Sequence, residues 1–458
     1  MLTSWIKQFT SKIGQKVFSS MMIVGGLSFV VKIIAFIKER FIAQQFGIGD
    51  SLDAFYLAYL LPAFAVTVVP ASFSTALIPT YLDSKKTDSK NASQIASGIL
   101  LFSIVFSTLF SLLLVLGSYY LFPKIANGFT SNKIDLAFSL TLIMIPIIVI
   151  SSCNNIWSAI INANGFFSLV SITPLASSIS IIVVLATIGQ EYGVYSLALG
   201  TLFGCIAESI LLVLFMREHD FVILPKWYVN SPEIRKIANQ LLPIALGTLI
   251  LSSTSVIDQS TASMLDPGAI SILNYSNKLV GSIISLGSIS IASVFLPHFS
   301  HMVVANRWED IKQTLITYSV LILLVTAILI VFLLYFSHTI IVYLFQGGAF
   351  TPEDVVSVSM VQSVFIWGIP GSFLGILFVR FISSVNENSV LTISAVISLC
   401  LKLVLNYLLV KIMGIKGIAL STVIVFIVSC VYLGFKSFRI ISRRNLANED
   451  CNSRKNDS

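Results

Sequence analysis

The sequence predicts an all-α polytopic membrane protein with about 12 transmembrane helices. Of its 458 residues, 56% are hydrophobic and only 11% are charged, whereas a soluble domain carries about 25% charged residues. The apolar residues lie in long runs of Leu, Ile, Val and Phe, and a helix needs roughly 20 such residues to cross a bilayer. The mean hydropathy of +0.92 agrees. Little of the chain is left for a soluble domain.

Polar or Gly/Pro breaks separate the apolar runs and define the predicted helices in order. The first run follows three lysines, as in a signal peptide, but it continues into Lys38-Glu39-Arg40 without a small-residue cleavage site, which favours a retained helix. The predicted spans are 19–40, 52–80, 95–121, 136–162, 167–188, 193–216, 236–263, 268–298, 313–337, 355–384, 389–410 and 414–437.

A long polar segment in the middle of the chain divides six predicted helices from six. The second and eighth helices both end in a small-residue stretch closed by proline, Pro79 and Pro297, which suggests that the halves are repeats around a central cavity. The predicted parts are an N-terminal segment (1–18), a first six-helix lobe (19–216), a linker (217–235), a second lobe (236–437) and a disordered tail (438–458).

The distribution of Lys and Arg predicts the orientation of the chain. Cytoplasmic loops of membrane proteins carry an excess of Lys and Arg. Most of the 28 basic residues lie in the termini or in loops predicted to be inside, and the loops predicted to be outside hold only Lys124, Lys133, Lys411 and Lys416. We therefore expect a multi-pass protein of the bacterial inner membrane with both termini cytoplasmic. The net charge of +7 is explained by topology, so nucleic acid is not an expected partner.

Some basic residues lie within predicted helices, where a Lys at the centre of a span costs about 2.5–3.5 kcal/mol. Lys32 shares a helical stripe with Glu39, but the two are about 10 Å apart along the axis, too far for an ion pair. Lys32 is therefore expected to face a cavity. For Lys38, snorkelling to the membrane surface is the alternative. Lys278 lies within the eighth predicted helix.

Lys402 and Asn406 are four residues apart in the eleventh predicted helix, so they share one helix face. A buried ammonium requires a carboxylate partner, and Asp258 in the seventh predicted helix is the nearest candidate. A structural ion pair and an ion-coupling site both fit these three residues.

The sequence contains no nucleotide-binding, zinc-protease, EF-hand or nucleophile-elbow motif. The 4 histidines and 5 cysteines are scattered, without the spacing of metal ligands. We therefore expect no catalytic residues, no metal site and no cofactor, and hence no enzyme. Transport without an ATP site draws on a sodium or proton gradient, on the membrane potential or on the gradient of the substrate.

Several stretches resemble one known family. They are V-K-I-I-A-F-I-K-E-R-F-I-A-Q-Q-F-G-I-G-D-S-L-D-A-F-Y-L-A-Y-L-L-P (31–62), F-S-T-A-L-I-P (73–79), A-I-I-N-A-N-G-F-F (159–167), N-Y-S-N-K-L (274–279), V-F-L-P-H-F-S (294–300), F-Q-G-G-A-F-T (345–351) and L-N-Y-L-L-V (405–410). In this order they resemble the MviN/MurJ lipid II flippases, within the superfamily of multidrug, oligosaccharidyl-lipid and polysaccharide exporters. The resemblance spans nearly the whole chain.

The resemblance implies a central cationic cavity that binds the diphosphate of an undecaprenyl-linked saccharide. Lys32 and Lys38 fall on family arginines of the first helix, Asp53 on an aspartate of the second and Lys278 on an arginine of the eighth. These four are the candidate substrate-binding residues. A further family arginine falls near Val66 and is absent, and lysine lacks the bidentate fork that suits phosphate. The family also usually has two additional C-terminal helices that this sequence does not contain. The departures leave the saccharide open between lipid II and a related polysaccharide unit.

The same resemblance bears on coupling, because some relatives hold a sodium ion between the seventh and eleventh helices. Asp258 and Asn406 fall close to those positions, and Lys402 lies one turn away. An ammonium there could replace the ion.

The leading hypothesis is a flippase that carries an undecaprenyl-diphosphate-linked saccharide to the outer leaflet by alternating access. Moving each negative charge out of an inside-negative cell is favourable by about 2.3 kcal/mol per 100 mV. Two alternatives are a cation-coupled multidrug antiporter of the same superfamily and a non-transporting scaffold for cell-wall assembly. Cell-wall or polysaccharide synthesis proteins are the expected protein partners.

Overall fold

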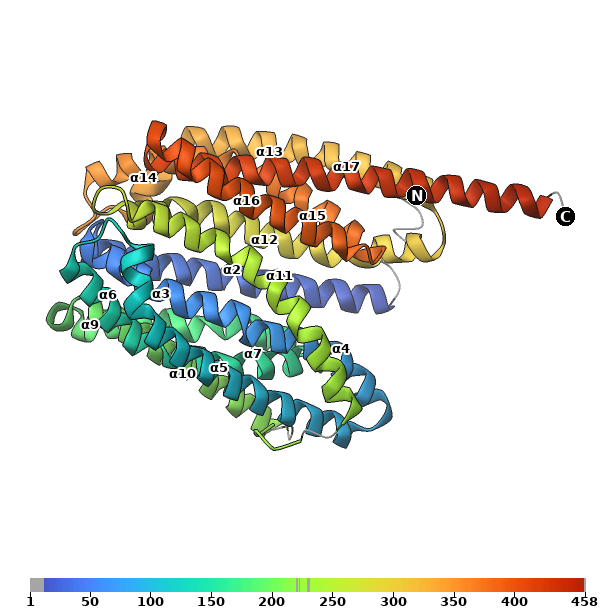
Figure 1. Ribbon diagram of the computed structural model, residues 1–458, viewed down its shortest axis with the longest axis horizontal. Coiled ribbons are helices and arrows are strands. Elements are labelled where there is room, and N and C mark those ends of the chain that lie inside the picture. The colour runs from blue at the N-terminus through green and yellow to red at the C-terminus, as the bar shows by residue number, and fades with distance from the viewer. Residues whose placement is uncertain (1–11, 220, 222, 229–230, 457–458) are drawn as a thin grey trace. The chain divides into compact units, whose positions relative to one another are not determined.

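The computed structural model describes residues 12–219, 221, 223–228 and 231–456 of the chain (Figure 1). Within these residues all regular structure is helical, apart from an isolated bridge between Gly347 and Phe350. The chain forms two compact units. Unit 1 comprises Met1–Ser252 and Gly347–Phe350, and unit 2 comprises Ser253–Gln346 and Thr351–Ser458.

Many helices begin at proline, because the fixed φ of proline suits the first turn and its missing N–H has no partner there in any case. The helices that begin in unit 1 are α2 (Lys12–Phe46), α3 (Asp50–Val68), α4 (Pro70–Thr87), α5 (Ser89–Ile125), α6 (Ser131–Met144), α7 (Pro146–Ala163), α8 (Phe167–Ile172), α9 (Pro174–Tyr192), α10 (Val194–Glu218) and α11 (Pro232–Ala262). Prolines 70, 146 and 174 each divide one long predicted span into two helices.

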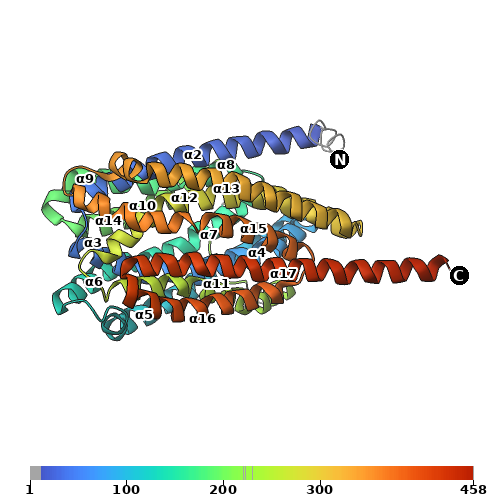
Figure 2. The same cartoon turned by 90° about the horizontal axis from the view of Figure 1, so that it is seen from above.

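Unit 2 continues the same pattern. Its helices are α12 (Ala269–Val304), α13 (Trp308–Phe345), α14 (Pro352–Ile366), α15 (Ile369–Ser384), α16 (Asn388–Met413) and α17 (Ile415–Asn456). α16 and α17 pack against each other and lie side by side in both views (Figures 1 and 2).

The prediction of an all-α polytopic membrane protein is confirmed. In the described part of the chain, ten helical stretches are long and apolar enough to cross a membrane, and the α14–α15 pair, bent by 40°, raises the count to at most 11. They follow the predicted spans from 52–80 onward in order. α2 covers the first predicted span, 19–40, and carries Lys32, Lys38, Glu39 and Arg40. The count of about 12 stays a prediction.

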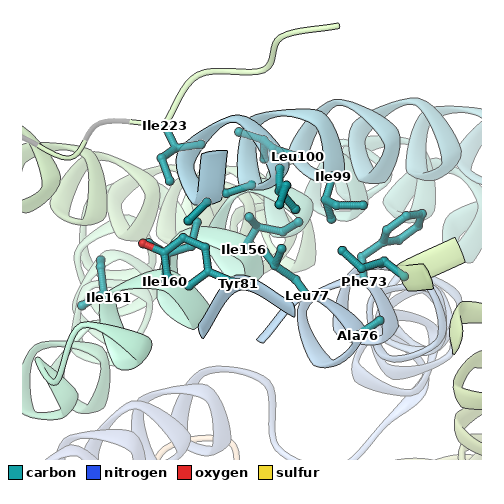
Figure 3. Close-up of a cluster of buried hydrophobic side chains, with 14 of the residues drawn as sticks. Phe73, Ala76, Leu77, Tyr81, Ile99, Leu100, Ile156, Ile160, Ile161 and Ile223 are labelled. Atoms are coloured by element: carbon teal, nitrogen blue, oxygen red, sulfur yellow. The ribbon is translucent and has the colours of Figure 1, made fainter. Parts of the chain in front are cut away.

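An apolar core in unit 1 holds α4, α5 and α7 together (Figure 3). Leu77 of α4, Leu100 of α5 and Ile156 of α7 are fully buried there, and Ile223 closes the cluster from the segment after α10. Small polar residues join α5 to α7 nearby, where the Ser152 hydroxyl donates to Ser107 Oγ at 2.6 Å. Hydrogen bonds of this kind commonly stabilise the association of membrane helices.

Two predicted boundaries differ from the structure. The predicted linker, 217–235, includes the start of α11, and the division between the units falls later, between Ser252 and Ser253. The reason is that Ile234 and Ile237 of α11 belong to the core of unit 1. The N-terminal part of the chain also differs, because α2 begins at Lys12 within the predicted segment 1–18; residues 1–11 lie outside the described residues.

In the described part of the predicted disordered tail, 438–456, the chain is instead helical, because α17 continues to Asn456. Packing explains the difference as far as residue 445. Ile441 is buried in the core of unit 2, the Arg444 guanidinium lies over the Trp308 ring, and Asn445 donates to Glu309 at 3.2 Å. A composition rich in Arg, Asn and Ser therefore did not predict these contacts.

The four residues Gly347–Phe350, here called the 347–350 turn, belong to unit 1 and pack on the end of α2. The backbone N–H of Ala349 donates to the carbonyl of Gln44 at 2.7 Å. Gly348 has a φ of +56°, and a Cβ at this position would lie 2.2 Å from the Gln44 carbonyl oxygen. Only glycine fits such a close approach in this conformation.

Candidate functional site

Lys32 and Lys38 lie in the second half of α2, a helix that packs on α8 and α9. Lys38 forms an ion pair with its neighbour Glu39 at 2.9 Å, and the Glu39 side chain is buried. Lys32 is half-buried and lies about 9 Å from Lys38 along the axis. At 3.6 residues per turn the two lysines lie about 120° apart around α2, so they do not share one helix face. In this conformation the Glu39 carboxylate neutralises the Lys38 ammonium.

Asp53 lies in the first turn of α3 and pairs with a lysine of α6. Its carboxylate is buried, with 2% of the side chain exposed, and it accepts from the Lys133 ammonium at 3.3 Å. Lys133 also donates to Asp50 at 2.7 Å and lies over the Phe129 ring. The Asp53 carboxylate therefore helps to fasten α3 to α6, and its role in substrate binding stays a prediction.

Sequence reasoning missed Lys133 as a buried residue, since it counted this lysine among the residues of an exposed loop. The residue lies in the first turn of α6 and is 9% exposed. The available signal was the Asp50/Asp53 pair, because residues three apart in a helix present two carboxylates on one face.

Removing the Lys133 ammonium is expected to destabilise unit 1. Because both Lys133 and Asp53 are buried, Lys133→Met should cost about 3 kcal/mol of unfolding free energy. Asp50→Asn is the matched control: Asp50 is 63% exposed, so solvent screens its contact and the cost should stay below about 1 kcal/mol. Denaturation of the purified protein in detergent measures both. Equal costs for the two variants would contradict the assignment.

Lys278 lies in α12 of unit 2 and is half-buried. Lys32, Lys38 and Asp53 all lie in unit 1. A single cavity shared by all four therefore stays a prediction.

The structure brings Asp258, Lys402 and Asn406 together within unit 2. The Lys402 ammonium lies 2.8 Å from Asp258 Oδ1. The Asn406 amide donates to the same oxygen at 2.8 Å and approaches Thr261 Oγ1 at 3.4 Å. The predicted one-face arrangement on α16 is what allows the lysine and the amide to reach one carboxylate of α11.

Helix α17 completes this cluster with residues that sequence reasoning did not single out. The Lys402 ammonium donates to the hydroxyl oxygens of Ser421 at 2.9 Å and of Thr422 at 2.5 Å. The Ser421 hydroxyl donates to Asn406 Oδ1. Lys402 is 2% exposed. Nothing in the sequence separates this serine and threonine from the many helical Ser and Thr residues that bond only to their own backbone.

The cluster places a positive charge among hard oxygen ligands. One carboxylate oxygen and two hydroxyl oxygens surround the Lys402 nitrogen, and carboxylate and neutral oxygens are also the donors that hard metal cations prefer. The Lys402 ammonium thus supplies the positive charge at this junction of three helices. Among the described residues, no three His, Cys, Asp or Glu side chains are grouped as metal ligands.

Comparison with known proteins decides the family. A family model described as "Lipid II flippase MurJ" matches residues 42–446, which is most of the chain. The chain belongs to the lipid II flippase MurJ family.

Individual MurJ relatives agree with this assignment. The chain is 26% identical over 414 residues to a probable lipid II flippase MurJ of Buchnera aphidicola subsp. Baizongia pistaciae, covering 88% of this chain and 80% of the relative. A solved structure of a lipid II flippase MurJ in an inward closed conformation is 22% identical, with a TM-score of 0.76 and coverage of 93% and 91% of the two chains. A multidrug-resistance MATE transporter in an inward-facing conformation is 13% identical, with a TM-score of 0.72 and coverage of 92% and 99%.

The resemblance predicted from the sequence is confirmed, and MATE transporters share the fold alone. Membership of the MurJ family, together with the apolar helices, identifies a multi-pass bacterial membrane protein of a transporter family. The substrate-binding roles of Lys32, Lys38, Asp53 and Lys278 stay predictions, and so does the role of the Asp258 cluster.

Proposed function

We propose that this protein is a lipid II flippase that carries its substrate from the inner to the outer leaflet of the cytoplasmic membrane. The observation that carries the proposal is the MurJ family match over residues 42–446. Lys32 and Lys38 of α2 and Lys278 of α12 supply ammoniums that can donate hydrogen bonds to the oxygens of a diphosphate. A two-unit helical protein without a nucleotide-binding motif suits alternating access.

The function is tested by complementation of a strain depleted of its own lipid II flippase. Expression of this protein is expected to restore growth and the appearance of labelled lipid II in the outer leaflet. If a well-expressed protein fails here but rescues a strain that lacks a polysaccharide flippase, the substrate is another undecaprenyl-linked saccharide. Drug efflux without rescue of either strain would favour the antiporter alternative.

For coupling, we propose that transport requires no bound sodium and that the membrane potential gives it direction. The support is the position of the Lys402 ammonium, which donates to Ser421 and Thr422 and pairs with Asp258. Expulsion of a diphosphate from an inside-negative cell is favourable by about 2.3 kcal/mol per charge per 100 mV.

For topology, we propose that both termini face the cytoplasm and that the loop between α13 and α14 faces outward. In a background with the native cysteines replaced, Glu353→Cys should react with an impermeant maleimide in intact spheroplasts, whereas Arg443→Cys should react only after permeabilisation. Both positions are exposed, so access is decided by the side of the membrane. Labelling of Arg443→Cys in intact cells would overturn the orientation.

A further inference from the structure

Unit 1 contains an apolar cavity that the transport cycle proposed above does not use. Its volume is 380 Å³, and it lies between the α3–α4 junction, α5 and the first half of α11. Val69, Phe73, Phe102, Leu241 and Ala245 are among the residues that line it. Figure 3 shows Phe73 of α4 near Ile99 of α5, and both side chains line this cavity.

The lining offers almost no partner for a polar molecule. Ser72 is the one residue of the lining with a polar side chain, and its hydroxyl donates to the Val68 carbonyl at 2.6 Å and lies 3.3 Å from Thr248 Oγ1. A water needs two to four polar partners to remain in a cavity, and apolar cavities stay dry or bind hydrocarbon. A saccharide or a phosphate would be unsatisfied here for the same reason.

The size of the cavity fits one hydrocarbon chain. An engineered apolar cavity of roughly 150 Å³ binds benzene, so a cavity about 2.5 times larger has room for about 15 carbon atoms. This matches a single acyl chain of a membrane phospholipid. The undecaprenyl tail of a lipid-linked saccharide is several times too large to fit.

The cavity also has a route to the bilayer. α5 and α11 are candidate membrane spans, and α3 and α4 together form another. Phe106 and Leu242 line the cavity and are 55% and 66% exposed. In a membrane such exposed apolar side chains face lipid, so the medium at the mouth of the cavity is acyl chain.

We propose that this cavity is a binding site for one acyl chain of a membrane phospholipid, which fills the space between α11 and the α4–α5 pair. Close packing is a main source of stability in an apolar interior, because a void leaves its lining atoms without contact partners. The bound chain thus serves as a replaceable part of the core of unit 1. This proposal is independent of which saccharide the protein carries.

The test is retention of phospholipid through purification. Wild-type protein extracted from a phosphatidylglycerol-rich membrane into detergent is expected to keep one tightly bound phospholipid per chain, measured by native mass spectrometry and lipid extraction. Ala238→Phe combined with Ala245→Phe places two rings in the cavity, so retained phospholipid should fall about tenfold or more. Ala186→Phe, at an exposed position of α9, is the matched control and should retain lipid as wild type does.

A second measurement separates loss of the site from loss of the fold. The filled variant should stay monodisperse in detergent, and its melting temperature should no longer rise when phosphatidylglycerol is added back. Wild type and Ala186→Phe should both gain stability from that addition, and Ala245→Leu, a smaller intrusion, should show a reduced gain. Equal retention in wild type and the folded double variant would overturn the proposal, as would a polyprenyl lipid as the retained species.

Discussion

Lys32→Ala and Lys278→Ala are each expected to abolish rescue of a strain depleted of its lipid II flippase while protein levels stay normal. An ammonium that bonds a phosphate oxygen contributes about 1.5–3 kcal/mol, so each loss should weaken substrate binding at least about tenfold. Lys32→Arg and Lys278→Arg keep the charge and add the planar fork that phosphate favours. These variants should retain activity.

Lys236→Ala is the control, because it removes an exposed lysine outside the proposed binding set. It should complement as well as wild type. Growth rescue by both Lys32→Ala and Lys278→Ala at normal expression would refute the assignment of these lysines to the substrate.

Lys402→Gln and Asp258→Asn are each expected to cost about 3–5 kcal/mol of unfolding free energy, because removing one partner of a buried pair leaves the other charge in a low-dielectric site. The double variant Asp258→Asn with Lys402→Gln should recover part of that loss. Lys411→Gln is the matched control on the same helix, since this lysine is exposed and bonds only to Tyr407 at 2.6 Å among the contacts of the described residues. Unfolding in mixed detergent measures all four.

The Asp258–Lys402 pair also predicts whether flipping depends on sodium. Flipping in reconstituted vesicles should be insensitive to sodium in the wild type, because the Lys402 ammonium already supplies the charge that an ion would bring. Stimulation of the wild type by sodium that disappears in Asp258→Asn would contradict the ion-pair account and would assign Asp258 to an ion.

The spans could be predicted from the sequence because hydrocarbon imposes one requirement on every helix. A run of apolar residues either reaches across the bilayer or does not, and polar breaks such as 217–235 mark where it ends. Boundaries set by packing could not be predicted in this way. Ile234 and Ile441 are ordinary apolar residues in polar surroundings, and only the core that each one joins shows where a unit ends.

Part of the candidate site could also be predicted from the sequence. A charged residue within an apolar run is rare and requires a partner of opposite charge, and this rule predicts the pair of Lys402 and Asp258. The burial of Lys133 could not be predicted in this way, because this lysine lies at a helix end, where a lysine is normally solvated. Its burial depends on Asp50 and Asp53, which lie about 80 residues earlier in the chain. No local pattern records such a contact.

The 347–350 turn has a consequence for how the chain acquires its structure during synthesis. Unit 1 ends at Ser252 except for these four residues, which are made 95 positions later. At about 5–20 residues per second, the ribosome supplies them roughly 5–20 s after the rest of the unit. Until then the backbone carbonyl of Gln44 lacks the Ala349 N–H that it accepts in the finished protein. Unit 1 of the nascent protein therefore lacks its last four residues until nearly half of unit 2 has been translated.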